Sequence, residues 1–197
     1  TVDWELIPPP EILGNWASQV SWMNRLATER LGVPCNKSLT HPNACCDYRP
    51  AYGEMFADKY VGYDWWGWCD LDIVFGDLDS LLPSLLSDCD VLSFKEPYLS
   101  GCLVFLRNNP RVVSSFRNSP IWREALEDSN YRCWDEQGRL YPENNFQETL
   151  LRTGLLLSRR PDLCGYDAPQ ERNLMEYKNG MVIDLHDGRE KLFWHFM

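Results

Sequence analysis

The chain has 197 residues, of which 44% are hydrophobic, and this is enough to bury a substantial core in one domain. Its formal net charge is -10 at pH 7. Such an acidic surface repels phosphate backbones, which argues against a nucleic-acid partner. A nucleotide is not excluded, because one bound divalent cation reverses the local sign of the charge.

The cysteines and the hydropathy pattern restrict the class of protein further. None of the eight cysteines belongs to a Cys-x-x-Cys pair, which argues against a zinc ribbon. Their even number permits disulfides in an oxidising compartment, and the sequence alone leaves that question open. No stretch is apolar for long enough to cross a bilayer, and no signal peptide heads the chain. We expect a cytoplasmic location in a bacterium, whereas the Golgi lumen stays open for a eukaryote.

The amino-terminal third is expected to be mainly helical. A strand over Val2–Ile7 would be stopped by three prolines, and the apolar spacing of Glu11–Leu31 predicts one or two helices that end at Gly32. A second helix is expected over Arg49–Tyr60. The next segment, Tyr63–Leu78, is so apolar and aromatic that it indicates a buried strand.

The rest of the chain alternates between strand and helix patterns. We expect further helices and strands in the following places, the last two forming a hairpin across Asp187-Gly188: a helix over Leu81–Leu86, strands over Asp90–Phe94 and Gly101–Arg107, a helix over Arg111–Leu126 broken near Pro120, a helix over Asn144–Leu157, and strands over Met181–Leu185 and Lys191–Phe196. This order predicts a single α/β domain over residues 1–197.

Two acidic residues on the aromatic strand carry most of the functional signal. Asp70 and Asp72 are two positions apart, so on a strand their carboxylates point to the same side. Two like charges side by side are costly unless something neutralises them. Mg²⁺ and Mn²⁺ bind one or two protein carboxylates together with substrate phosphates, so we predict a metal site here. The alternative is a solvated acidic turn that Asp77 and Asp79 continue.

The same segment resembles a poorly characterised family of glycosyltransferase-like proteins. Members of that family carry a Lys-Pro-Ala-Tyr-Gly block followed by a Trp-Gly-x-x-Asp-x-Asp-x-x-Phe-Gly block. This chain has Arg49-Pro50-Ala51-Tyr52-Gly53 and then Trp66-Gly67-Trp68-Cys69-Asp70-Leu71-Asp72-Ile73-Val74-Phe75-Gly76. Shorter pieces also resemble the family's pattern: Ser100-Gly101, Phe105-x-Arg107-Asn108, Asp135-Glu136 and His195-Phe196. Arg49 departs from the usual Lys, which keeps the charge but changes the donor geometry.

The resemblance implies a GT-A fold, with a mixed central sheet flanked by helices. It implies a nucleotide-sugar donor linked to UDP or GDP, a carbohydrate or glycoconjugate acceptor, and Mn²⁺ or Mg²⁺ as the cofactor. Asp72 would bind the metal directly, and Asp70 would contact the donor ribose or reach the metal through water. His195 is the candidate for a further metal ligand, although it could be an ordinary strand histidine. The first nucleotide-binding strand of such a fold is expected upstream of Thr1, so the chain would be a fragment.

The resemblance also assigns roles to residues outside the acidic pair. Asp135 and Glu136 would lie near the acceptor, where one carboxylate could act as general base, and the alternative is an exposed turn. Arg49 could neutralise diphosphate oxygens, and a surface salt bridge is the alternative. Tyr52 is placed in the donor site with the motif that contains it. Gly101 would let the backbone approach a sugar closely, and a plain turn is the alternative.

Two other functions compete with the transferase. The first is a phosphohydrolase of the haloacid dehalogenase type, in which Asp70 would attack phosphorus. The chain lacks a convincing second acidic pair of the kind that this family needs, and the Trp-rich segment before Asp70 does not fit it. The second is a non-catalytic carbohydrate- or divalent-metal-binding module that keeps the fold. Trp66 and Trp68 could face the site, but we expect them to fill the core.

Overall fold

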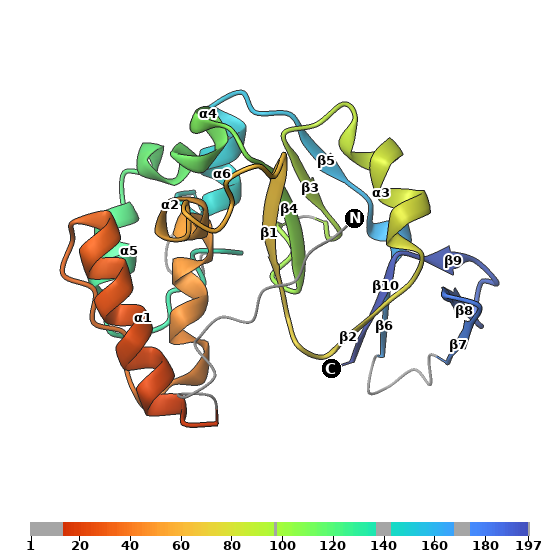
Figure 1. The fold of residues 1–197 in the computed structure, drawn as a ribbon, viewed down its shortest axis with the longest axis horizontal. Helices are drawn as coiled ribbons and strands as arrows, with labels where there is room; N and C mark the ends of the chain where they lie inside the picture. Colours follow the sequence, from red (N-terminus) through yellow and green to blue (C-terminus); the bar gives the residue numbers. More distant parts are fainter. Residues whose placement is uncertain (1–13, 97, 137–142, 168–173, 197) are drawn as a thin grey trace. The chain divides into compact units, whose positions relative to one another are not determined.

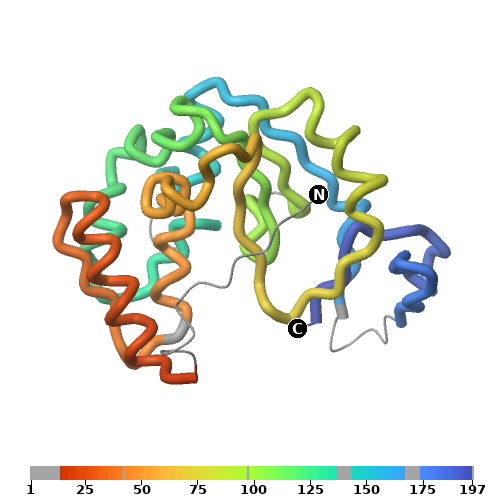
Figure 2. Tube along the Cα trace, in the orientation of Figure 1, coloured from red at the N-terminus to blue at the C-terminus, as the bar shows by residue number. Residues whose placement is uncertain are grey.

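The computed structural model describes residues 14–96, 98–136, 143–167 and 174–196. The chain forms two compact units, each built from separate stretches of sequence. The sheet unit contains residues 67–105 and those described from 156 onwards, and the helical unit contains the described residues up to 66 together with those between 106 and 155. Figure 2 follows the chain through these crossings. The prediction of a single domain stays a prediction, and the strand expected over Val2–Ile7 lies outside the described residues.

The helical unit begins with α1, Trp16–Leu31, which confirms the predicted helix over its described part. The Asn15 side chain caps its start by accepting a hydrogen bond from the Ser18 backbone N–H at 3.0 Å. Gly32 ends it with φ 69°, a left-handed conformation that glycine adopts without steric cost.

The helix predicted over Arg49–Tyr60 is largely wrong. The structure has a 3-10 helix η2, Pro42–Ala51, followed by the single helical turn α2, Tyr52–Met55. Pro50 has no backbone N–H to donate, so it cannot take part in a regular α-helical hydrogen-bond ladder at the junction.

The remaining helices of this unit are short. The predicted broken helix is confirmed as α4 Pro110–Val113, η3 Ser115–Asn118 and α5 Trp122–Glu127. α6, Phe146–Arg152, is shorter than predicted. Leu151 in this helix is 44% exposed. The core of the unit consists of side chains that are almost completely buried, including Tyr48, Met55, Phe116, Trp134 and Phe146.

The sheet unit contains a four-stranded sheet with the order β1-β4-β3-β5. Its strands are β1 Trp65–Cys69, β4 Leu103–Arg107, β3 Val91–Ser93 and β5 Leu157–Arg159 (Figure 1). β3 and β5 are parallel. Backbone hydrogen bonds from Asn108 N to Asp64 O and from Asp70 N to Cys102 O, at 2.7 and 2.8 Å, show that β1 and β4 are antiparallel. The sheet is therefore mixed, and a mixed α/β fold is confirmed.

A second sheet of three strands has the order β2-β10-β6, and these strands are β2 Ile73–Phe75, β10 Phe193–Phe196 and β6 Cys164–Asp167. β10 is antiparallel to β2 and parallel to β6. The helix α3, Leu78–Leu86, lies between β2 and β3 in the sequence. It is longer than the predicted helix and packs on β3.

The third sheet consists of β7 Met175–Lys178, β8 Met181–Asp184 and β9 Glu190–Lys191. The predicted terminal hairpin is correct only for β8 and β9. After Lys191 the chain leaves this sheet and forms β10. Phe193 and Trp194 in β10 are completely buried, and a two-stranded ribbon could not cover them. No helix in the described part of the chain has the length and apolar character needed to cross a membrane.

Candidate metal centre

Asp70 and Asp72 lie in the connection between two strands, not within one strand as predicted. β1 ends at Cys69 and β2 begins at Ile73, and these strands belong to different sheets. The Asp70 backbone N–H donates to Cys102 O at 2.8 Å, which fixes the start of this connection. Leu71 is 95% exposed, so the apolar pattern is interrupted where the chain changes sheet. The alternation argument for the two carboxylates therefore does not apply.

The two carboxylates nevertheless meet at one histidine. In the ladder between β2 and β10, His195 lies opposite Ile73, and the Phe196 backbone N–H donates to Asp72 O at 2.9 Å. His195 Nε2 is 3.2 Å from Asp72 Oδ1 and 3.8 Å from Asp70 Oδ2. One ligand atom from each residue lies within 4.8 Å of the others, a spacing that could hold a metal ion.

The three side chains differ in their access to solvent. The His195 side chain is 12% exposed, that of Asp70 is 29% exposed and that of Asp72 is 56% exposed. A cation held here would have protein ligands on one side and room for water or a phosphate on the other. Two carboxylates and an imidazole form a ligand set that suits Mn²⁺.

The sequence analysis gave no role to the thiol beside this cluster. A hydrogen bond with Cys102 is the main reason why the pKa of His195 is raised, and the charges of Asp72 and Asp70 raise it further. Cys102 is buried, and its Sγ lies 3.1 Å from Ser100 Oγ. Hydrogen bonds with Cys164, His195 and Ser100 lower the pKa of Cys102. None of the eight cysteines, all of which are described, forms a disulfide.

Gly101 and the two tryptophans of β1 are buried. Trp68 Nε1 donates to the carbonyl oxygen of Gly101 at 3.1 Å, and Gly101 itself is buried. Trp66 and Trp68 are both buried, so the expectation that they fill the core is confirmed. The role of Gly101 near a donor sugar stays a prediction.

In the helical unit the structure brings Arg49 and Asp135 together. Arg49 Nη1 lies 3.2 Å from Asp135 Oδ2, and Asp135 is completely buried, so its alternative as an exposed turn is wrong. Burial raises the pKa of Asp135 to about 8, although Arg49 opposes this shift. Glu136 is half-buried, and the half-buried Tyr52 packs edge-on against Phe56. Burial also raises the pKa of the Tyr52 hydroxyl.

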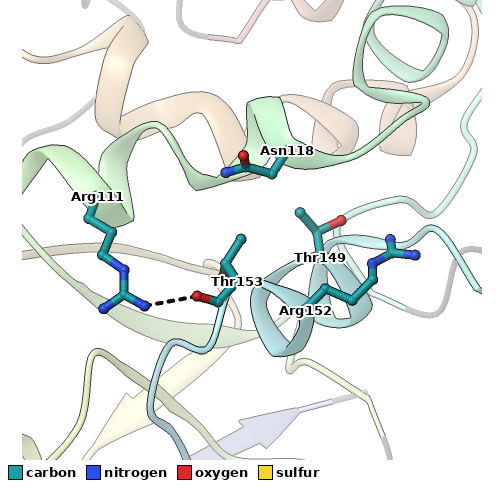
Figure 3. A pocket seen from close by; sticks show the side chains of 5 residues that line it. All are labelled: Arg111, Asn118, Thr149, Arg152 and Thr153. Atoms are coloured by element: carbon teal, nitrogen blue, oxygen red, sulfur yellow. Dashed lines mark hydrogen bonds between the residues drawn. The ribbon is translucent and has the colours of Figure 1, made fainter.

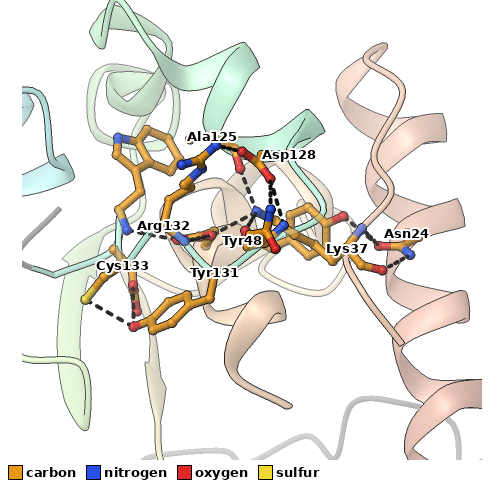
Figure 4. A network of polar contacts seen from close by, with 12 residues as sticks. Asn24, Lys37, Tyr48, Ala125, Asp128, Tyr131, Arg132 and Cys133 are labelled. Carbon is orange, nitrogen blue, oxygen red and sulfur yellow. Dashed lines mark hydrogen bonds and ion pairs between the residues drawn. The ribbon is translucent and has the colours of Figure 1, made fainter. Parts of the chain in front are cut away.

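A buried ion pair holds the segment that contains Asp135, and the sequence analysis missed it. Lys37 Nζ lies 2.8 Å from Asp47 Oδ2, with both side chains completely buried. Asp47 also accepts hydrogen bonds from the backbone N–H groups of Arg132 and Trp134, each at 2.8 Å. Figure 4 shows Lys37 at the centre of this network. Cys133, which lies between Arg132 and Trp134, has φ 56°, an uncommon conformation for a residue other than glycine.

The predicted site residues thus fall into two groups. Asp70, Asp72, His195 and Gly101 belong to the sheet unit, where the first three form one cluster. Arg49, Tyr52, Asp135 and Glu136 belong to the helical unit, where the first and third form an ion pair.

Comparisons with known proteins give one match. No curated protein and no solved structure matches this chain. A family described as a family of unknown function, DUF6625, matches residues 15–191, and this match includes Arg49, Tyr52, Asp70, Asp72 and Asp135 but ends before His195. Since the match covers most of the sequence, the chain belongs to family DUF6625.

Proposed function

We propose that this chain is a metal-dependent glycosyltransferase domain of the GT-A type. It would move a sugar from a UDP- or GDP-linked donor to a carbohydrate or glycoconjugate acceptor. The observation that supports this proposal is the convergence of Asp70, Asp72 and His195 within 4.8 Å. The histidine comes from a strand more than a hundred residues away in sequence, so neighbours in an acidic turn do not account for the cluster.

Asp72 and His195 would hold Mn²⁺ or Mg²⁺, and Asp70 would either complete this ligand set or orient a water or ribose hydroxyl beside it. When bound, the cation would stabilise the negative charge on the leaving nucleoside diphosphate. The exposed side of Asp72 leaves room for the diphosphate oxygens.

The remaining roles rest on the family resemblance alone. It implies that Arg49 and Tyr52 contact the donor and that Gly101 permits close approach of the sugar. Asp135 or Glu136 would accept the proton of the acceptor hydroxyl.

Calorimetric titration with Mn²⁺ and then UDP or GDP tests the metal site. We expect metal-dependent diphosphate binding by the unchanged protein, and a loss of at least about tenfold in affinity for Asp72→Asn. Asp88→Asn is the matched control, because Asp88 is an exposed acid of the same unit with no contact to the cluster. Equal affinity of Asp72→Asn and the unchanged protein would remove the proposal.

Turnover separates the transferase from its alternatives. Hydrolysis or transfer of a nucleotide sugar with Mn²⁺, abolished by a chelator, supports the enzyme. Binding of the diphosphate without turnover of any donor supports the non-catalytic module. Hydrolysis of a generic aryl phosphate that is lost in Asp70→Asn supports the phosphohydrolase.

A further inference from the structure

A polar hollow in the helical unit lies apart from all the residues considered so far. Its volume is about 480 Å³, and it is lined by Arg111 of α4, Asn118 of η3, and Thr149, Arg152 and Thr153 in and after α6 (Figure 3). This volume lies within the range of small-molecule sites in proteins.

The charge of this hollow is opposite to that of the whole chain. It is lined by two arginines and no acidic residue, although the chain has a net charge of -10. Among the described residues, neither Arg111 nor Arg152 forms an ion pair with a carboxylate. By contrast Arg30, Arg49 and Arg160 each pair with an aspartate. No carboxylate of the described residues balances the charge of these two guanidinium groups, so they can attract an anionic ligand.

The two guanidinium groups are held in different ways. Arg111 Nη2 donates to Thr153 O at 2.8 Å and to Gly154 O at 3.1 Å, which fixes this group at the carboxyl end of α6. Its Nε and Nη1 donate to no other described residue. Arg152 makes only long contacts, at 3.4 Å, with the side-chain oxygen of Asn144. Several N–H donors in the hollow are therefore available to an anionic group.

The neutral side chains of the hollow offer acceptors and one further amide N–H donor, that of Asn118. Thr149 Oγ1 donates its proton to Asn145 O at 3.0 Å, and Thr153 Oγ1 donates its proton to Leu150 O at 2.6 Å. The amide nitrogen of Asn118 donates to Ser115 O at 3.1 Å, and its amide oxygen accepts from no other described residue. These oxygens keep lone pairs that a ligand with hydroxyl groups can satisfy.

We propose that this hollow binds an anionic saccharide, meaning a sugar that carries a phosphate or carboxylate group. Arg152 would bind the anionic group, with Arg111 adding positive charge, and the side-chain oxygens of Thr153 and Asn118 would accept hydrogen bonds from sugar hydroxyls. Inorganic phosphate lacks the sugar ring with its set of hydroxyl groups, and a neutral sugar leaves the arginines without an anionic partner. The inference does not rest on the metal centre, because no lining residue belongs to the Asp70, Asp72 and His195 cluster.

Titration of the whole chain with four probes in the presence of a chelator tests this site without the metal. The probes are glucose 6-phosphate, glucuronate, glucose and inorganic phosphate. We expect at least one of the two anionic sugars to bind about tenfold more tightly than both glucose and inorganic phosphate, a difference of about 1.4 kcal/mol, because glucose lacks the anionic group and inorganic phosphate lacks the sugar hydroxyls. The better of the two identifies the anionic group, and amide NMR shifts should map its binding to residues 149–153.

Variants of the hollow complete the test. Arg152→Gln removes an exposed charge and should weaken binding of the anionic sugar about tenfold, whereas Arg123→Gln, an exposed arginine of the same unit outside the hollow, should change it less than about twofold. Thr153→Val should weaken the binding of glucose 6-phosphate more than the binding of inorganic phosphate. The proposal is overturned by equal binding of glucose, by equal binding of inorganic phosphate, by no binding of either anionic sugar, or by an unchanged affinity in Arg152→Gln.

Discussion

At Gly165 the absence of a side chain decides where His195 can lie. Gly165 is opposite Trp194 in the parallel pair of β6 and β10, and a Cβ atom at this position would overlap the Trp194 ring. Trp194 is almost completely buried, so its ring cannot move aside into solvent. Any shift of β10 that relieves this overlap also shifts His195, the next residue.

We therefore predict that Gly165→Ala has two effects. It should lower the free energy of unfolding by about 1–3 kcal/mol through overpacking, and it should weaken Mn²⁺ binding. Urea unfolding and calorimetry measure these effects. Leu71→Ala is the control, because Leu71 is exposed although it lies between the two acids, and it should change stability by less than about 0.5 kcal/mol. Unchanged Mn²⁺ affinity in a destabilised Gly165→Ala protein would show that the position of β10 does not affect metal binding.

Asp135 predicts a specific dependence of stability on pH. Burial raises its pKa from 3.8 to about 8, so the folded state binds this proton more tightly than the unfolded state does. The stabilisation is fully present below about pH 4 and is lost as the pH rises through about 8. Asp135→Asn cannot titrate, so its free energy of unfolding should fall less between pH 5 and pH 8 than that of the unchanged protein. Parallel urea titrations at the two pH values measure this difference, and equal pH dependence of both proteins would contradict it.

The buried ion pair of Lys37 and Asp47 links elements that the chain keeps far apart. It joins the segment after α1 to the backbone of Arg132 and Trp134, and Lys37 Nζ also donates to Ala125 O of α5 at 2.6 Å. Removing one partner of such a pair leaves a buried charge that is only partly compensated.

Lys37→Met should therefore cost about 3–5 kcal/mol of stability. The exposed pair of Arg30 and Asp58 gives the matched control, since Arg30→Met should cost less than about 1 kcal/mol. Thermal and urea unfolding of both variants measure the two costs. A loss of similar size in both would show that the buried network is not what holds these elements together.

Elements with a strong local signal were predictable from the sequence. The apolar spacing and Gly32 located α1, and the apolar runs located β3 and β4. β5, β6 and β7 were missed, because they are short and partly exposed or glycine-containing, so alternation does not mark them. Their position depends on partners that are distant in sequence, such as β10 for β6.

The candidate site was predictable in its members but not in its geometry. The Asp-x-Asp spacing and the family resemblance together gave Asp70, Asp72 and His195. The sequence placed both acids on one strand, whereas the change of sheet between Cys69 and Ile73 places them in a connection. The sequence does not mark Cys102, because a cysteine in an apolar run gives no local signal of a contact with His195.

At the scale of the whole molecule, the division into two units makes the metal proposal testable by hydrogen exchange. The three proposed ligands all belong to the sheet unit. At a Mn²⁺ concentration about 100 times the dissociation constant, binding stabilises the state that holds the metal by about 2.7 kcal/mol. We expect this protection at the amides of β1, β2 and β10, and much less in α1 and α6. Asp72→Asn should show no Mn²⁺-dependent protection, and equal protection of both units would contradict a site confined to one of them.

The position of His195 has a consequence for the unfolded chain. A cation that holds Asp72 and His195 together closes a loop of more than a hundred residues. This loop includes β3, β4 and the stretch of the helical unit between residues 106 and 155. A permanent cross-link over a loop of about 100 residues would be worth about 4.7 kcal/mol, but an exchangeable cation does not remain on the unfolded chain. The chain between the two ligands would therefore be closed into a loop only while β2 and β10 are paired.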